Sequence, residues 1–274
     1  HNEASGFVST VSGGQRNKAL GLRSTVSGGL DNEATETRSV VSGGENNKAY
    51  AEGAVIVGGK DNLIESLAKN STIVGGLTNT IINGCEYSFI AGSGNKIGTV
   101  ASPAVVTAAY ALGANNTVDS NNSFSFGILN VIGVASENSV ILGGHSSSLS
   151  QGSSSSIIGG YGCTLNGDNN IILGGDLARV DAMRSIVGGS GGAGDPLGIG
   201  GYDYLSKGGR IIPKSPAEYS GIYGGRGCYI NGGTDPDPKE GNFIIASLKS
   251  SIGAEGANVG VSSNSILASL DSEI

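Results

Sequence analysis

The sequence predicts an all-β fold, a β-solenoid whose coils of about 15 residues stack along one axis. A Gly-Gly pair recurs at intervals of 15 residues, beginning at Gly13, Gly28, Gly43 and Gly58. Most of these pairs follow a short β-branched segment, and an asparagine or cysteine comes shortly after them. Because 49 of the 274 residues are glycine, long helices are disfavoured and the array must consist of strands and turns.

Each repeat is predicted to contain two short strands and two corners. The segments SVVSGG, SVILGG, SSIIGG and NIILGG are β-branched and end in glycine, which is typical of a strand followed by a turn. A second, weaker strand is represented by NKALG at residues 17–21 and by NTVDS at residues 116–120. The phrase Gly-Gly-x-x-Asn predicts a corner, since glycine and asparagine tolerate positive φ.

Alternation along the first strand predicts which side chains face the core. One position is apolar throughout and is expected inside: Val11, Val26, Val41, Ile56, Ile73 and Ile90. The next position points outward and changes from serine to apolar residues: Ser12, Ser27, Ser42, Val57, Val74, Ala91 and later Leu142 and Leu173. An apolar outer face needs cover, so we expect a homo-oligomer whose subunits pack along the long axis. The alternative is a wider three-sided β-helix that buries these residues within one chain.

Composition narrows the functional classes. The net charge of −7 argues against binding nucleic acid or an anionic membrane surface. The sequence contains no run of 18 apolar residues, so we expect no membrane span. Cys163 and Cys228 occupy equivalent corners several coils apart and are expected to be free thiols. Both ends of the sequence fall inside a repeat, so we expect the chain to be part of a longer protein.

The array becomes irregular over residues 190–241, which follow a regular array at 1–189 and precede final coils at 242–274. This segment holds five of the six prolines and five of the nine tyrosines, and insertions in a solenoid form loops at its corners. Such loops commonly carry recognition. The candidate ligand-binding residues are Tyr202, Asp203, Tyr204, Arg210, Lys214, Tyr219, Tyr223 and Tyr229. The alternative is that these tyrosines cap the end of the core.

Signatures of catalysis and cofactor binding are weak. GSGGAG at residues 189–194 matches a dinucleotide motif, but Pro196 and Gly198 prevent a helix from following, so we expect no cofactor. With two histidines and no C-x-x-C, we expect no metal site and no serine triad. A pair of carboxylates could hydrolyse a glycan at a separation of about 5–9.5 Å. The candidates for that role are Asp195, Asp203, Glu218, Asp235 and Asp237.

The repeat itself resembles known fibrous proteins. NEASGFVSTVSGGQRNKALGLRSTVSGG, residues 2–29, resembles the head repeat N-x-A-x-G-x-x-S-x-A-x-G of YadA-like trimeric autotransporter adhesins. STIVGGLTNTI, residues 71–81, is similar to repeats of bacteriophage tail fibres and tailspikes. The resemblance covers most of residues 1–190 and implies a left-handed β-roll that trimerises along its length. The adhesin neck, stalk and membrane barrel are absent here, which favours the phage fibre.

These observations lead to one leading expectation and two alternatives. The chain is expected to be a non-enzymatic, extracellular, receptor-binding segment of a homotrimeric fibre, carried on a virion tail. Its loops at residues 190–241 would recognise a host surface glycan or an outer-membrane receptor. The first alternative is the head of a bacterial surface adhesin that binds along its coils. The second alternative is a tailspike that depolymerises polysaccharide through the acidic residues.

Overall fold

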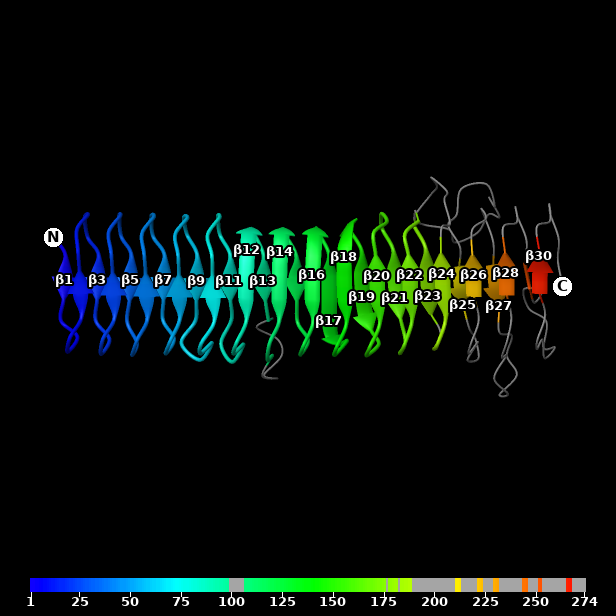
Figure 1. Ribbon diagram of the computed structural model, residues 1–274, viewed down its shortest axis with the longest axis horizontal. Coiled ribbons are helices and arrows are strands. Elements are labelled where there is room, and N and C mark those ends of the chain that lie inside the picture. The colour runs from blue at the N-terminus through cyan, green and yellow to red at the C-terminus, as the bar shows by residue number, and fades with distance from the viewer. Residues whose placement is uncertain are drawn as a thin grey trace. The chain divides into compact units, whose positions relative to one another are not determined.

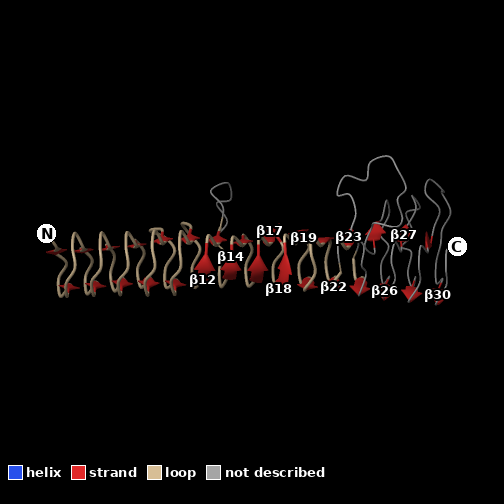
Figure 2. Ribbon diagram, turned by 90° about the horizontal axis from the view of Figure 1, so that it is seen from above, coloured by secondary structure: helices blue, strands red, loops and turns tan. Residues whose placement is uncertain are grey.

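The computed structural model describes residues 1–98, 106–175, 177–181 and 183–188, together with the backbone of six strands between residues 210 and 267. The chain forms two compact units, His1–Val134 and Ala135–Ile274. All the regular elements of the described residues are strands, drawn as arrows in Figure 1, and none is a helix. Strands and connecting turns alternate throughout these residues, as Figure 2 shows. The predicted all-β class is confirmed.

In the first unit the strands form two parallel sheets, A and B. Sheet A has the spatial order β1 (Glu3–Ala4), β3 (Lys18–Ala19), β5 (Glu33–Ala34), β7 (Lys48–Ala49), β9 (Leu63–Ile64), β11 (Thr80–Ile81), β13 (Lys96–Ile97), β15 (Thr117–Val118) and β17 (Val131–Ala135). Sheet B has the order β2 (Thr10–Val11), β4 (Thr25–Val26), β6 (Val40–Val41), β8 (Val55–Ile56), β10 (Thr72–Ile73), β12 (Phe89–Ser93), β14 (Tyr110–Ala114) and β16 (Phe124–Ile128).

The second unit repeats this arrangement. Sheet A contains β19 (Ser148–Gln151), β21 (Thr164–Asn166), β23 (Arg179–Asp181), β25 (Arg210–Ile212), β27 (Tyr229–Asn231) and β29 (Ser251–Ile252). Sheet B contains β18 (Val140–His145), β20 (Ser156–Ile158), β22 (Ile171–Leu173), β24 (Ile186–Gly188), β26 (Gly221–Tyr223), β28 (Phe243–Ile245) and β30 (Ser265–Leu267).

The pairing register shows how the coils stack. Val11 pairs with Val26 and Val26 with Val41, which are steps of 15 residues. Each coil therefore contributes one strand to each sheet, and each strand pairs with its counterpart in the next coil. This is a β-solenoid with coils of about 15 residues, as the glycine spacing predicts.

The core lies between the two sheets. The inward position of sheet B is fully buried at Val26, Val41, Ile56, Ile73 and Ile90, which confirms the predicted interior for these residues. Val11, which is also expected inside, is only partly buried in the first coil. Sheet A contributes alanines in the first coils and larger residues later: Ala19, Ala34, Ala49, Ile64, Ile81, Ile97, Val118 and Ile132. Since each fully buried isoleucine contributes about 1.5–3 kcal/mol, the later coils have the stronger core.

The corners differ in one respect from the prediction. Positive φ occurs at the second glycine of each pair, as at Gly14 (+80°) and Gly29 (+92°), and at the residue before the asparagine, as at Arg16 (+56°). Asn17 is not among the positive-φ residues. The expectation that asparagine is needed there for its backbone conformation is therefore wrong, and its side chain explains it instead.

Candidate functional site

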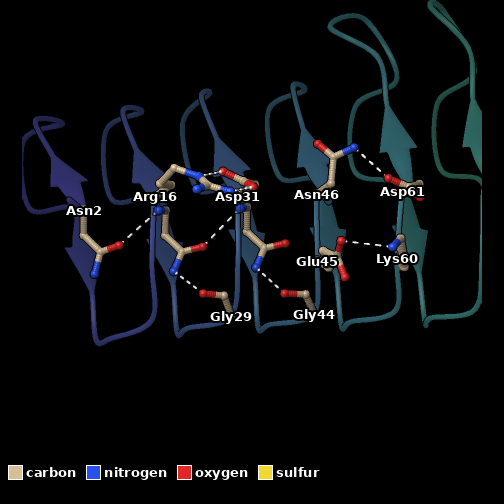
Figure 3. A network of polar contacts seen from close by, with 11 residues as sticks. Asn2, Arg16, Gly29, Asp31, Gly44, Glu45, Asn46, Lys60 and Asp61 are labelled. Carbon is tan, nitrogen blue, oxygen red and sulfur yellow. Dashed lines mark hydrogen bonds and ion pairs between the residues drawn. The ribbon is translucent and has the colours of Figure 1, made fainter.

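The asparagines form a buried ladder along one corner of the first unit. The backbone N–H of Asn17 donates to Oδ1 of Asn2 at 3.0 Å, and its Nδ2 donates to the carbonyl oxygen of Gly29 at 2.9 Å (Figure 3). The same Nδ2 also donates to the carbonyl oxygen of Gly13 at 2.9 Å. The same backbone-to-side-chain bond recurs at Asn32, Asn47, Asn62, Asn79, Asn95, Asn116 and Asn130. Each asparagine thus ties its own coil to both neighbours and holds the glycine corner in place.

Ion pairs connect the same coils on the outside. Arg16 donates two hydrogen bonds of 2.6 Å to Asp31, and Lys60 donates one of 2.9 Å to Glu45 (Figure 3). The hydrogen bonds from Arg16 lower the pKa of the Asp31 carboxyl. Because these pairs are exposed to solvent, each contributes little to stability.

The outward side chains of sheet A alternate in charge in the first four coils. Glu3 lies beside Lys18, Lys18 beside Glu33, and Glu33 beside Lys48 in the strand register. A groove of about 210 Å³ crosses this surface and is lined by Arg16, Lys18, Asp31, Asn32, Glu33, Asn46 and Lys48. Its lining mixes both signs of charge, so it offers no concentrated field for a charged ligand.

Sheet B presents a different outer surface, with two outward columns in the first unit. One column is Thr10, Thr25, Val40, Val55, Thr72, Phe89, Tyr110 and Phe124. The other is Ser12, Ser27, Ser42, Val57, Val74, Ala91, Leu112 and Phe126. None of these residues is charged or buried, and the exposed fractions of Val57, Val74 and Phe126 are 48%, 44% and 50%. The surface changes from hydroxyl-bearing to apolar along the column, as predicted.

The second unit carries the same kind of face on sheet B. Leu142, Ile158 and Leu173 have exposed fractions of 43%, 44% and 44%. The described coils have two sheets rather than three, so the chain itself does not bury these side chains. Exposed apolar surfaces are the kind of surface through which proteins associate or bind ligands. The uncharged outer face of sheet B is therefore the candidate functional surface.

Three of the predicted ligand-binding residues lie in described strands. Arg210 in β25 and Tyr229 in β27 are direct partners in sheet A. Tyr223 in β26 lies in sheet B, between Gly188 and Ile245. The structure thus brings the backbones of Arg210 and Tyr229 together and places Tyr223 in the other sheet. The remaining candidates fall outside the described residues: Tyr202, Asp203, Tyr204, Lys214 and Tyr219, and the acidic residues Asp195, Glu218, Asp235 and Asp237.

The cysteines of the described residues are buried free thiols. Cys163 occupies the corner position that asparagine holds in earlier coils, as predicted, and its Sγ contacts the carbonyl oxygen of Gly175 at 3.4 Å. Burial raises the pKa of the Cys85 thiol to about 11, which keeps it protonated near neutral pH. Cys228 lies outside the described residues.

Clustered metal ligands and long apolar helices are absent from the described part of the chain. It holds no group of three or more histidine, cysteine or acidic side chains that could bind a metal ion. Within the same residues, no helix has the length and hydrophobicity needed to cross a membrane.

The chain matches no protein-family model and no curated protein sequence. The resemblance to adhesin heads and phage fibres thus depends on the repeat residues alone.

Sequence reasoning missed two features of the first unit. It assigned the repeated asparagines to turn conformation, although their exact period was the available signal for a ladder such as that of Asn17, Asn32 and Asn47. It also overlooked the alternation from Glu3 to Lys18 and onward, which is readable once the 15-residue repeats are aligned.

Proposed function

We propose that the chain is the structural and receptor-binding segment of a homotrimeric fibre of the phage-tail type, whose subunits pack through sheet B. The observation that supports this assembly is the exposed, uncharged outer face of sheet B, with Phe126 half exposed. Burying such a face between subunits removes apolar area from water at about 25 cal/mol per Å². A rigid stack of coils would then hold the recognition loops away from the base of the fibre.

The composition of the face favours a parallel arrangement of the subunits. In the first unit, Thr10, Ser12 and Thr25 lie at one end and Phe124 and Phe126 at the other. Parallel subunits match hydroxyl with hydroxyl and aromatic with aromatic side chains. Antiparallel subunits would instead set polar hydroxyls against apolar rings and leave those hydroxyls without partners, which is unfavourable.

The charges on sheet A favour its exposure to solvent. A parallel, in-register contact through sheet A would place Glu3 against Glu3 and Lys18 against Lys18 of the neighbouring copy. Like charges that face each other destabilise a contact, whereas within one chain the same alternation pairs opposite charges. Sheet B is thus the inner face and sheet A the outer face of the proposed fibre.

The number of subunits follows from the resemblance to YadA-like heads. Parallel subunits in register are related by an axis along the solenoid, which gives cyclic symmetry. Three copies around that axis enclose their three sheet B faces. The resemblance also supplies the extracellular setting and the phage-tail assignment.

Recognition of the host is proposed for the loops of residues 190–241. Deleting residues 195–209, which leaves strand β25 (Arg210–Ile212) in place, should abolish binding to host cells, because this removes Tyr202, Asp203 and Tyr204. Binding is measured with labelled protein on host cells, and the native mass of the variant shows whether the assembly persists. A matched control removes residues 16–45, two regular coils, and should retain binding.

Each outcome of that experiment distinguishes the proposal from its alternatives. Unchanged binding after deletion of residues 195–209 contradicts the proposed role of the loops. Loss of binding only on removal of residues 16–45 supports an adhesin head that binds along its coils. Release of oligosaccharides from host glycan by the intact chain contradicts a non-enzymatic function and supports a depolymerase.

A further inference from the structure

The first glycine of the Gly-Gly pair has no evident role within its own chain in the first four coils. At Gly13, Gly28, Gly43 and Gly58, φ lies outside the positive region, so the backbone does not require glycine. A Cβ atom added at any of the four would have no heavy atom within 4 Å beyond its chain neighbours. Alanine would therefore fit all four positions without strain.

Other glycines of the Gly-Gly pairs are required by their own chain. The second glycine of each pair combines positive φ with a Cβ position that clashes with the next coil, as at Gly29 and Gly44. In the second unit, the first glycines Gly143, Gly159 and Gly174 have φ of +74°, +75° and +69°. Their own conformation requires glycine. Neither reason applies to Gly13, Gly28, Gly43 or Gly58.

Glycine where alanine fits carries a stability cost, because glycine loses more backbone entropy on folding. A contact with something outside the chain would offset this cost. The four glycines are partly exposed, and each directly follows the second outward column of sheet B at Ser12, Ser27, Ser42 or Val57. They thus border the uncharged face, which becomes apolar at Val57 and Val74.

We infer that a second copy of this chain packs directly on the backbone of Gly13, Gly28, Gly43 and Gly58. This inference rests on the proposed assembly through sheet B and extends it to the first four coils. Beside Gly13, Gly28 and Gly43 the second outward column carries only Ser12, Ser27 and Ser42, which offer no large apolar side chain for a contact. Glycine allows the neighbouring subunit to come close enough for backbone and hydroxyl contacts. Sheet A is unsuitable for this partner because of its alternating charges.

The test compares association with the stability of the single chain. The double variant Gly28→Ala/Gly43→Ala should weaken subunit association about tenfold or more, since added methyl groups occupy the space of the neighbour. Association is measured by sedimentation velocity over a dilution series. In a background made monomeric by Phe126→Glu, the same two changes should leave the melting temperature unchanged or raise it by about 2 °C.

Gly159→Ala is the matched control, because its φ of +75° makes alanine unfavourable in the chain itself. It should lower the melting temperature in the monomeric background. A similar fall for Gly28→Ala/Gly43→Ala would overturn the inference by showing that these glycines serve their own chain. Unchanged association, with Phe126→Glu still dissociating the assembly, would overturn the inference and leave the sheet B interface standing. A monomeric unmodified chain would overturn both.

Discussion

Replacing Gly44 by alanine should lower the free energy of unfolding by about 4 kcal/mol or more. Gly44 has φ of +91°, and an added Cβ would clash with the carbonyl oxygen of Gly59 in the next coil and crowd Nδ2 of Asn47. Backbone atoms cannot rotate away from a methyl group as a flexible side chain can. The strain would therefore spread into the asparagine ladder on both sides of the coil.

Gly43→Ala provides a control only one residue away. Gly43 has open space at Cβ and no positive φ, so this change should alter the free energy of the single chain by about 1 kcal/mol at most. Both variants are compared by urea denaturation followed by circular dichroism, in the Phe126→Glu background. Equal losses for Gly43→Ala and Gly44→Ala would contradict the account of the corner.

The second large effect is expected at Asn47. Asn47→Ala should lower the free energy of unfolding by roughly 3–5 kcal/mol, because it removes several hydrogen bonds and leaves their partners buried without one. Nδ2 of Asn47 donates to the carbonyl oxygens of Gly43 at 3.0 Å and Gly59 at 2.9 Å. Its Oδ1 accepts the backbone N–H of Asn62 at 3.1 Å.

A substitution at the next residue distinguishes the stability contributed by the asparagine ladder from that contributed by the neighbouring surface. Lys48→Ala changes the adjacent, outward side chain in β7 and should cost less than about 1 kcal/mol. The loss in free energy of unfolding for Asn47→Ser should lie between those for Lys48→Ala and Asn47→Ala, since Ser147 occupies the equivalent buried position in the second unit. Urea denaturation of the three variants measures these differences. A loss below about 1 kcal/mol for Asn47→Ala would show that the ladder adds little stability.

The coil and its two faces could be predicted because they depend on short-range patterns. Val26 and Val57 follow the strict alternation of a strand, and the 15-residue spacing fixes which residues pair. The ladder could not be derived from turn propensities, because asparagine suits both a left-handed corner and a buried hydrogen-bonding column. Only the three-dimensional stacking shows that Asn17 and Asn32 are bonded to each other.

Other features depend on three-dimensional geometry that the residue types alone do not specify. Gly43 and Gly44 are the same residue type side by side, yet only Gly44 is required by its own chain. The segment that holds Tyr202 and Lys214 does not follow the 15-residue repeat, so the repeat period cannot predict where these two residues lie. Arg210 and Tyr229 pair in sheet A because the strands on either side of the intervening segment rejoin the same array.

The most direct test of the central claim is the native mass of the purified chain by multi-angle light scattering. The proposed fibre predicts three times the chain mass of 27.2 kDa, and Phe126→Glu should reduce it to a single chain. A mass of 27.2 kDa for the unmodified chain would contradict the assembly through sheet B. The exposed valines, leucines and phenylalanines of that face would then require a different partner.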